Sequence, residues 1–184
     1  MFYLETEHLI LRDVLVTDAE DFFKMDAHPD VHRYLGNNPI IKLMQAHDAI
    51  KFIRQQYIDN GIGRWATIEK SSGNFIGWSG LKLVTELENK HSHYLDVGYR
   101  FHPDYWGKGY ATESTNAALR YGFEKLNAKE IIGACHEKNV ASRRVLEKCG
   151  LKFIEQFNWK NITCDWLKIT KEEWSVWVKE PHTC

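Results

Sequence analysis

A short glycine-rich segment ahead of a predicted helix is the part of the sequence best suited to bind an anion. Gly107-Lys108-Gly109 follows the strand-forming stretch 97–101 and precedes apolar residues at near-helical spacing over 111–126. The first amides of a helix have no partner within the helix, and the macrodipole adds partial positive charge there. Glycines let an anion approach these amides closely, and Lys108 adds a cation. The segment therefore predicts an anion site at the start of this helix.

Two common nucleotide-binding motifs do not fit this segment. A Walker loop needs a glycine at the position of His102 and a serine or threonine at the position of Gly109. A dinucleotide fingerprint needs its third glycine at the position of Thr112. A nucleoside-triphosphate loop is therefore not expected. Taken alone, the Gly-x-Gly pair is equally typical of a flexible turn, so a second motif has to decide.

That second motif lies further along the chain. Gly98-Tyr99, Pro103 and the run 105–113 resemble the acetyl-CoA-binding motif of the GNAT superfamily of N-acetyltransferases, and most closely its RimJ/RimL-type branch. Asn139-Val140-Ala141-Ser142 and the run 146–151 are similar to the family's second segment, with Leu151 where the family carries Phe. The two motifs stand in the family's order, and the resemblance covers nearly the whole chain.

The resemblance implies both a fold and an activity. It implies one GNAT domain over residues 1–184, with an α+β fold: a mixed, mostly antiparallel central sheet, helices on both faces and a splayed strand pair. The implied reaction is acetyl transfer from acetyl-CoA to a primary amine, by direct attack in a ternary complex. The acceptor would be a protein N-terminal α-amine or a small-molecule amine. A non-catalytic domain that binds CoA or a peptide is the alternative.

The resemblance also assigns the cofactor-binding residues. Backbone amides of the glycine loop would hold the pyrophosphate, and they belong to Gly107, Lys108, Gly109, Tyr110, Ala111 and Thr112. The pantetheine arm would pair like an added strand with Tyr99, Arg100 and Phe101, and an amide near Phe101 would stabilise the oxyanion. Asn139 would contact the cofactor arm or the acceptor, and it is also a natural helix N-cap.

The catalytic assignments rest on one departure from the family pattern. Many relatives carry a tyrosine seven residues after the motif asparagine, where this chain has Leu146. Ser142 matches a position where the RimJ/RimL-type branch carries a serine, so the resemblance implies Ser142 as the hydrogen-bond donor to the leaving thiolate, with completion of its helix turn as the alternative. Glu137 is a candidate base together with His136, Asp96 and Glu155, and each of these has an ordinary structural role as its alternative. The general base stays open.

The protonation of the acceptor amine sets how strong a base is needed. An α-amino group of pKa about 7.8 is roughly a tenth to a fifth neutral at pH 7, whereas a lysine of pKa about 10.4 is neutral in less than one molecule per thousand. The difference corresponds to roughly 3.5 kcal/mol. An N-terminal acceptor therefore needs only a weak base or a water chain. Tyr34, Trp65 and Trp78 could line the acceptor site, with a core position as the alternative for each.

The composition excludes several other classes of protein. The net charge of −1 gives no basic field for nucleic acid, and no apolar run approaches 18 residues. The first eight residues carry no signal pattern, and none of the 4 cysteines forms a C-x-x-C pair, so a cytoplasmic protein with reduced thiols is expected. His28 and His32 lack a nearby third ligand, so no metal is expected. A monomer and a homodimer both stay open.

Local patterns predict the elements that position these residues. Thr17 and Glu20 form a capping box for a helix ending near Ala27, where Pro29 stops continuation. Consecutive strands with short loops favour antiparallel pairing, and the later strand–helix–strand order favours one parallel pair. The expected strands are 9–13, 64–69, 75–84, 94–101, 131–135, 151–157 and 164–169, and the other helices are 44–57, the one after Gly109, 140–148 and one from Thr170.

Overall fold

The central sheet has eight strands, and a computed structural model describes it within residues 2–179. The strands are β1 (Tyr3–Glu5), β2 (Leu9–Asp13), β3 (Trp65–Glu69), β4 (Phe75–Val84), β5 (Tyr94–Phe101), β6 (Glu130–His136), β7 (Lys152–Trp159) and β8 (Ile162–Thr170). They lie in the order β1-β2-β3-β4-β5-β6-β8-β7, and every neighbouring pair is antiparallel except β5 and β6. The expected mixed, mostly antiparallel sheet is confirmed.

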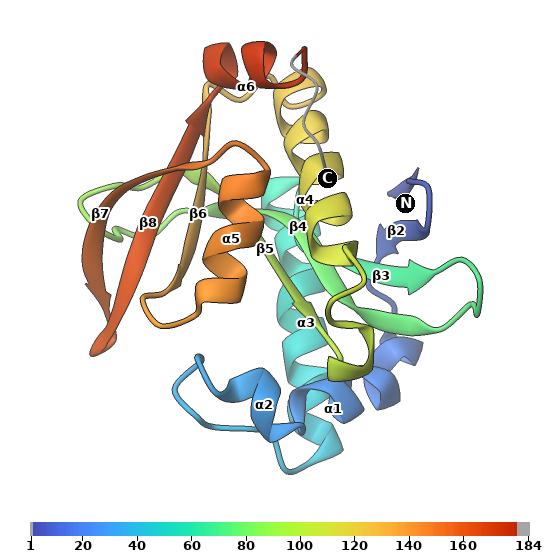
Figure 1. The fold of residues 1–184 in the computed structure, drawn as a ribbon. Helices are drawn as coiled ribbons and strands as arrows, with labels where there is room; N and C mark the ends of the chain where they lie inside the picture. The colour runs from blue at the N-terminus through green and yellow to red at the C-terminus, as the bar shows by residue number, and fades with distance from the viewer. Residues whose placement is uncertain (1, 180–184) are drawn as a thin grey trace.

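Helices cover both faces of this sheet. They are η1 (Val16–Asp18), α1 (Ala19–Asp26), α2 (Pro29–His32), α3 (Leu43–Asn60), η2 (Pro103–Tyr105), α4 (Tyr110–Glu124), α5 (Val140–Lys148) and α6 (Lys171–Trp177). In Figure 1, α4 and α5 lie side by side in front of β5, and α3 passes behind the sheet. One buried apolar cluster packs α4 and α5 against the sheet, and a second packs α1 and α3 against it.

Short-range signals account for several helix starts. The Asn139 side chain accepts a hydrogen bond from the Ser142 amide at 3.1 Å, and Thr170 caps α6 in a capping box with Glu173, as their positions predict. The expectation for Thr17 is wrong. Thr17 lies inside η1, and Asp18 precedes α1 without a side-chain hydrogen bond to that helix. The Asp18 carboxylate instead accepts from the Leu15 amide at 2.8 Å and pairs with Arg12.

The pairing of β5 with β6 is short, and this positions the site. Only Leu95 with Ile131 and Asp96 with Ile132 are in register. Beyond them the two strands separate, so the β6-facing edge of β5 over residues 97–101 has no strand partner. Ala134 is exposed although β6 lies inside the sheet, which marks an open gap beside it. The splayed strand pair is therefore present.

The remaining expectations concern membranes, thiols and metals. Within residues 2–179, no helix combines the length and the apolar character that crossing a membrane requires. Cys135, Cys149 and Cys164 are free and buried, and Cys184 lies outside the described residues. No group of three or more acidic, histidine or cysteine side chains is placed to hold a metal in that same range.

Candidate active site

The loop before α4 holds its backbone in a conformation that only glycine adopts easily. Gly107 has a φ of 76° and Gly109 a φ of 84°, both in the left-handed region. Gly109 is also the N-cap of α4 and has no side chain to satisfy the helix amides. The indole nitrogen of Trp106 donates to the Phe101 carbonyl at 2.8 Å, which fastens the loop to the end of β5.

The amides at this helix start are available to a ligand. The Glu113 amide donates to the Gly109 carbonyl at 3.0 Å, but the amides of residues 107–112 find no acceptor in the described part of the chain. A Cβ built on Gly107 or Gly109 meets nothing within 4 Å, so the space around the loop is open. Six unpartnered amides around an open cradle fit a diphosphate, since the helix N-terminus favours anions.

Lys108 adds a cation beside the cradle. Its ammonium lies 3.7 Å from Glu69 Oε1 and 4.7 Å from the Tyr105 ring centroid, and the side chain is about half exposed. The Tyr110 hydroxyl donates to the same carboxylate at 2.7 Å, which raises the pKa of Tyr110 to about 12. Glu69 therefore takes up part of the local positive charge, and the amides remain the principal anion donors.

Ser142 and Tyr99 meet across the gap between β5 and α5. The Tyr99 hydroxyl donates to the Ser142 carbonyl at 2.9 Å and lies 3.0 Å from Ser142 Oγ. Burial raises the pKa of Tyr99, so the phenol stays protonated at neutral pH. These two contacts hold the Ser142 hydroxyl beside the phenol, and either hydroxyl can donate across the 3.0 Å contact. Sequence analysis placed Tyr99 at the cofactor arm only and missed this pairing.

The end of β6 carries two of the candidate bases. Glu137 is exposed, and its amide donates to the Thr163 carbonyl at 3.0 Å. The His136 ring lies 5.4 Å from the Tyr34 ring, which joins the segment after α2 to the rim of the gap. Asn139 follows as the cap of α5. The gap is therefore edged by two titratable side chains and one aromatic ring.

The other two candidate bases are already engaged. Asp96 forms an ion pair with Arg64, whose side chain is only 9% exposed. Glu155 is exposed on β7 and accepts a hydrogen bond from Asn89 at 3.0 Å. A base must reach the acceptor with a free lone pair, and these contacts leave Asp96 and Glu155 less suited than the residues at the end of β6.

The two tryptophans considered for the acceptor site occupy different environments. Trp65 is 1% exposed and its ring stacks on Phe2 with the centroids 4.1 Å apart, so Trp65 is a core residue and does not line the acceptor site. Trp78 on β4 is half-buried, with the guanidinium groups of Arg64 and Arg100 at 5.5 Å and 5.0 Å from its ring. Hydrophobic periodicity does not separate these two positions, because both lie on central strands.

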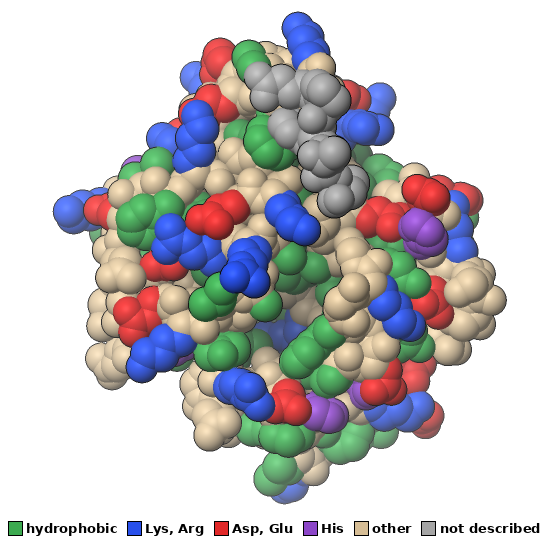
Figure 2. Space-filling model, viewed as in Figure 1, with side chains coloured by type: hydrophobic (Ala, Val, Ile, Leu, Met, Phe, Trp, Pro, Cys, Tyr) green, Lys and Arg blue, Asp and Glu red, His purple; other side chains and the backbone are tan. Residues whose placement is uncertain are grey.

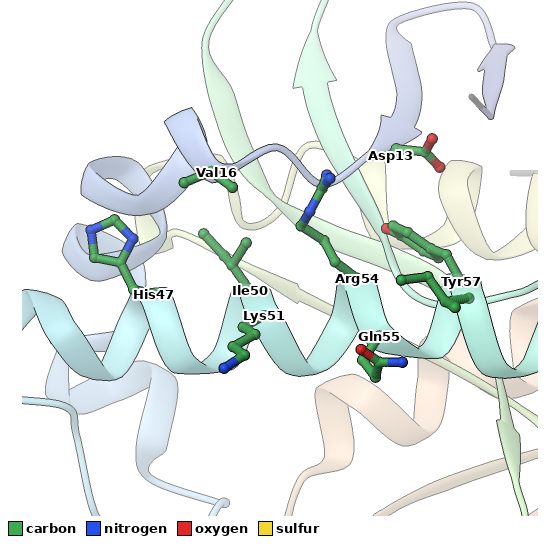
Figure 3. Close-up of a pocket in the computed structure, with 9 residues that line it drawn as sticks. Asp13, Val16, His47, Ile50, Lys51, Arg54, Gln55 and Tyr57 are labelled. Carbon is green, nitrogen blue, oxygen red and sulfur yellow. The ribbon is translucent and has the colours of Figure 1, made fainter.

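The surface is hollowed where these residues gather. Figure 2 shows a depression between α5 and the start of α4, with hydrophobic side chains at its edge and Lys or Arg atoms at its floor. A separate pocket of about 510 Å³ lies between α3 and segment 13–16 (Figure 3). No residue of the glycine loop or of the Asn139 segment lines that pocket, so it is not part of this site.

Comparison with known proteins gives the site its context. A family profile described as "Acetyltransferase (GNAT) domain" matches residues 8–152. The FsC-acetyl coenzyme A-N(2)-transacetylase of Aspergillus fumigatus is 40% identical over 100 residues, which cover 53% of this chain and 42% of that protein. The chain therefore spans less than half of that relative. The uncharacterized N-acetyltransferase YoaA of Bacillus subtilis is 29% identical over 87% of this chain and 90% of its own length.

Solved structures share the fold. A GNAT-family acetyltransferase from Bacillus anthracis superposes with a TM-score of 0.76 at 22% identity, covering 93% of this chain and 99% of that one. A spermidine N-acetyltransferase from Vibrio cholerae, solved with CoA and spermine, gives a TM-score of 0.71 at 20% identity and covers 92% and 99%. With the profile matching most of the chain, this protein belongs to the GNAT family of acetyltransferases.

Proposed function

We propose that this protein is a RimJ/RimL-like N-acetyltransferase that moves an acetyl group from acetyl-CoA to a primary amine by direct attack in a ternary complex. The observation that carries the proposal is the position of the amide cradle of residues 107–112 at one end of the β5–β6 gap. A diphosphate held there lets the rest of the molecule extend along the unpaired edge of Tyr99, Arg100 and Phe101.

The residues of the gap then have distinct roles. The amide near Phe101 stabilises the developing oxyanion, and Ser142 donates a hydrogen bond to the departing thiolate. Tyr99 positions Ser142 through its 2.9 Å and 3.0 Å contacts. Leu146, on the buried face of α5, is 1% exposed, so this chain has no tyrosine donor at that position. The pair from β5 and α5 supplies a hydroxyl in its place.

The acceptor amine enters from the face covered by α1 and α2. Glu137 lies at the rim and accepts the amine proton directly or through a water chain, with His136 as the alternative. Acetyl transfer to a primary amine is compatible with several classes of acceptor, namely protein N-termini, amino acids, small amines and polyamines. The transacetylase of Aspergillus fumigatus and the spermidine N-acetyltransferase of Vibrio cholerae are named for different acceptors, so the acceptor of this protein is a matter for assay.

A second candidate is a domain that binds CoA or a peptide without turnover. The observation in its favour is the apolar side chain of Leu146 at the position of the usual tyrosine. The enzyme and a non-catalytic domain that binds CoA both predict binding of acetyl-CoA, so binding alone does not separate these two.

The experiment is acetyl-CoA turnover with a panel of amines, read as release of free CoA thiol with a chromogenic disulfide. Calorimetry with acetyl-CoA is run in parallel on the same preparation. Thiol release that depends on one class of amine supports the enzyme. Tight binding with no release above the amine-free rate for any acceptor favours the non-catalytic domain that binds CoA. No binding at millimolar acetyl-CoA refutes the enzyme and leaves only a domain that binds a peptide.

A further inference from the structure

Arg100 projects from β5 onto the face opposite the glycine loop. Val97 and Phe101 belong to the core cluster that packs α4 against the sheet, and the side chains of a strand alternate between faces. The Arg100 guanidinium accordingly reaches Asp26 on α1, where one nitrogen donates to both carboxylate oxygens at 2.9 Å and 2.8 Å. The Arg100 side chain therefore lies on the acceptor face, while its backbone borders the gap.

A comparison with Arg64 shows what is unusual about Arg100. Arg64 donates to the Gly80 carbonyl, to the Asp96 carbonyl at 2.6 Å and to the Asp96 carboxylate, and it is 7% exposed. Arg100 uses one guanidinium nitrogen only, and its side chain is 22% exposed. Nε and the second terminal nitrogen have no acceptor among the described residues. Arg64 therefore forms a structural ion pair with its donors used, whereas Arg100 has donors left without an acceptor in the described structure.

The remaining donors of Arg100 lie among buried and half-buried neighbours. The Arg100 guanidinium lies 5.0 Å from the Trp78 ring centroid, and Asp26 is 4% exposed. His32 is 7% exposed, and its Nε2 atom lies 3.9 Å from Asp26 Oδ1 without a hydrogen-bond partner among residues 2–179. A buried polar atom without a partner is uncommon in native proteins, so this cluster is incomplete in the free protein.

The charges on this face favour an anionic ligand group. Asp26 and Asp96 are each paired with an arginine, and Glu88 accepts from the Tyr94 hydroxyl at 2.9 Å and from the Trp159 indole at 3.0 Å. These three carboxylates are already occupied, whereas guanidinium donors are left over. A planar guanidinium matches a carboxylate through two parallel hydrogen bonds.

We propose that Arg100 is a specificity residue that binds a carboxylate of the acceptor. This inference rests on the proposed acetyl transfer. It names the acceptor class as an amine that carries a carboxylate in the same molecule, such as an amino acid or a short peptide. The amine end of such a molecule faces the gap, and its carboxylate end lies between Trp78 and the α1–α2 segment.

The test compares acceptors that differ only in this group. Glycylglycine is paired with glycylglycinamide and β-alanine with β-alaninamide, and kcat/KM is read from CoA thiol release. The two pairs also distinguish a peptide from a free amino acid. A charge-assisted pair gives a preference of about tenfold to a hundredfold for the carboxylate in one of the two pairs. The readout is kcat/KM for the carboxylate divided by kcat/KM for its amide. Comparing this ratio between variants cancels the difference in amine basicity within each pair.

Arg100→Gln is expected to lower this ratio by about tenfold to a hundredfold relative to the wild type, and Arg100→Lys by less, because lysine keeps the charge but lacks the bidentate fork. The matched control is Arg33→Gln, which removes an exposed guanidinium of the same region that pairs with Asp30, and it should keep the wild-type ratio. Arg100→Gln leaves Asp26 buried without its partner, so the double variant Asp26→Asn with Arg100→Gln provides a neutral, folded version of the same change.

The outcomes separate this inference from the proposed function. A carboxylate-to-amide ratio that is the same in folded Arg100→Gln as in the wild type overturns the role of Arg100 and leaves acetyl transfer standing. If no amine is turned over, calorimetry of the same pairs on CoA-saturated protein decides. A carboxylate bound at least tenfold more tightly than its amide, and only with Arg100 present, supports the subsite. Equal or undetectable binding overturns it.

Discussion

Placing a charged side chain on Gly109 should abolish acetyl-CoA binding while leaving the protein folded. Gly109 has a φ of 84°, and a Cβ built on it meets nothing within 4 Å. Gly109→Glu therefore costs the left-handed strain of about 1–2 kcal/mol, without a clash. For a chain of this size that corresponds to a fall in melting temperature of about 2–8 °C. The carboxylate, however, would occupy the space in front of the free amides.

The expected loss of affinity is much larger than the loss of stability. Six amides, those of residues 107–112, have no hydrogen-bond acceptor in the part of the chain that the structure describes. Losing two charge-assisted hydrogen bonds at about 1.5–3 kcal/mol each raises the Kd by about 10² to 10⁴. Repulsion between the new carboxylate and the diphosphate adds to this. Calorimetry with acetyl-CoA measures the Kd, and circular dichroism measures the melting temperature.

Gly61→Glu is the matched control. Gly61 ends α3 with a φ of 68° and also has nothing within 4 Å of a built Cβ, but it lies outside the glycine loop. It should lose a similar amount of thermal stability and keep the wild-type Kd. Wild-type affinity in folded Gly109→Glu would refute the placement of the diphosphate. Equal loss of affinity in both variants would show that strain, and not occupation of the cradle, was responsible.

Three further predictions concern the hydroxyl donor, a surface ion pair and the thiols. Ser142→Ala should lower turnover by about 10² while the acetyl-CoA Kd measured by calorimetry stays the same, and unaltered turnover removes Ser142 from the chemistry. The hydrogen bond to Glu113 raises the pKa of His8 above 6.5, so its stabilisation is present below pH 6.5 and lost as the pH rises through the folded pKa. Melting temperatures at pH 6 and 8 should therefore differ more for the wild type than for His8→Gln, and equal differences would contradict this. Burial raises the thiol pKa to about 12, 12 and 11, so maleimide at pH 7.5 should leave three cysteines unmodified in the native protein by peptide mass spectrometry, namely Cys135, Cys149 and Cys164.

The features that the sequence predicts well are local ones. A glycine pair before an apolar helical stripe specifies the α4 start, and Asn139 and Thr170 are caps whose partners lie three residues away. Helix starts are set by neighbouring residues, so a pattern of a few residues contains the necessary information. The prediction at Thr17 was wrong because the carboxylate of Asp18, one residue on, accepts from the Leu15 amide and pairs with Arg12.

The short helix α2 shows the limit of reading proline as a stop. Pro29 ends α1 as expected, but it also occupies the first position of α2, where its missing amide hydrogen costs nothing. The His28 side chain accepts from the Asp30 amide at 3.2 Å and caps this turn. His28 is thus a helix cap, whereas His32 is a buried ring with Nε2 3.9 Å from Asp26 Oδ1.

The contacts that define the site join distant parts of the chain. Tyr99 and Ser142 are 43 residues apart, and Arg100 and Asp26 are 74 apart. Nothing in the local pattern around Tyr99 or Arg100 specifies these partners, because they meet only once the sheet has formed. The difference between Arg64, fully paired, and Arg100, partly paired, likewise depends on the neighbouring strands and not on the residue type.

The most direct test of the central claim is a titration of ¹⁵N-labelled protein with CoA, followed by amide chemical shifts. The account predicts that the amides of residues 107–112 shift most and saturate together, with smaller shifts along 97–101 at the gap. Saturating shifts confined to other surfaces, such as the pocket beside α3, or no shift at millimolar CoA, would contradict the claim that the start of α4 holds the diphosphate.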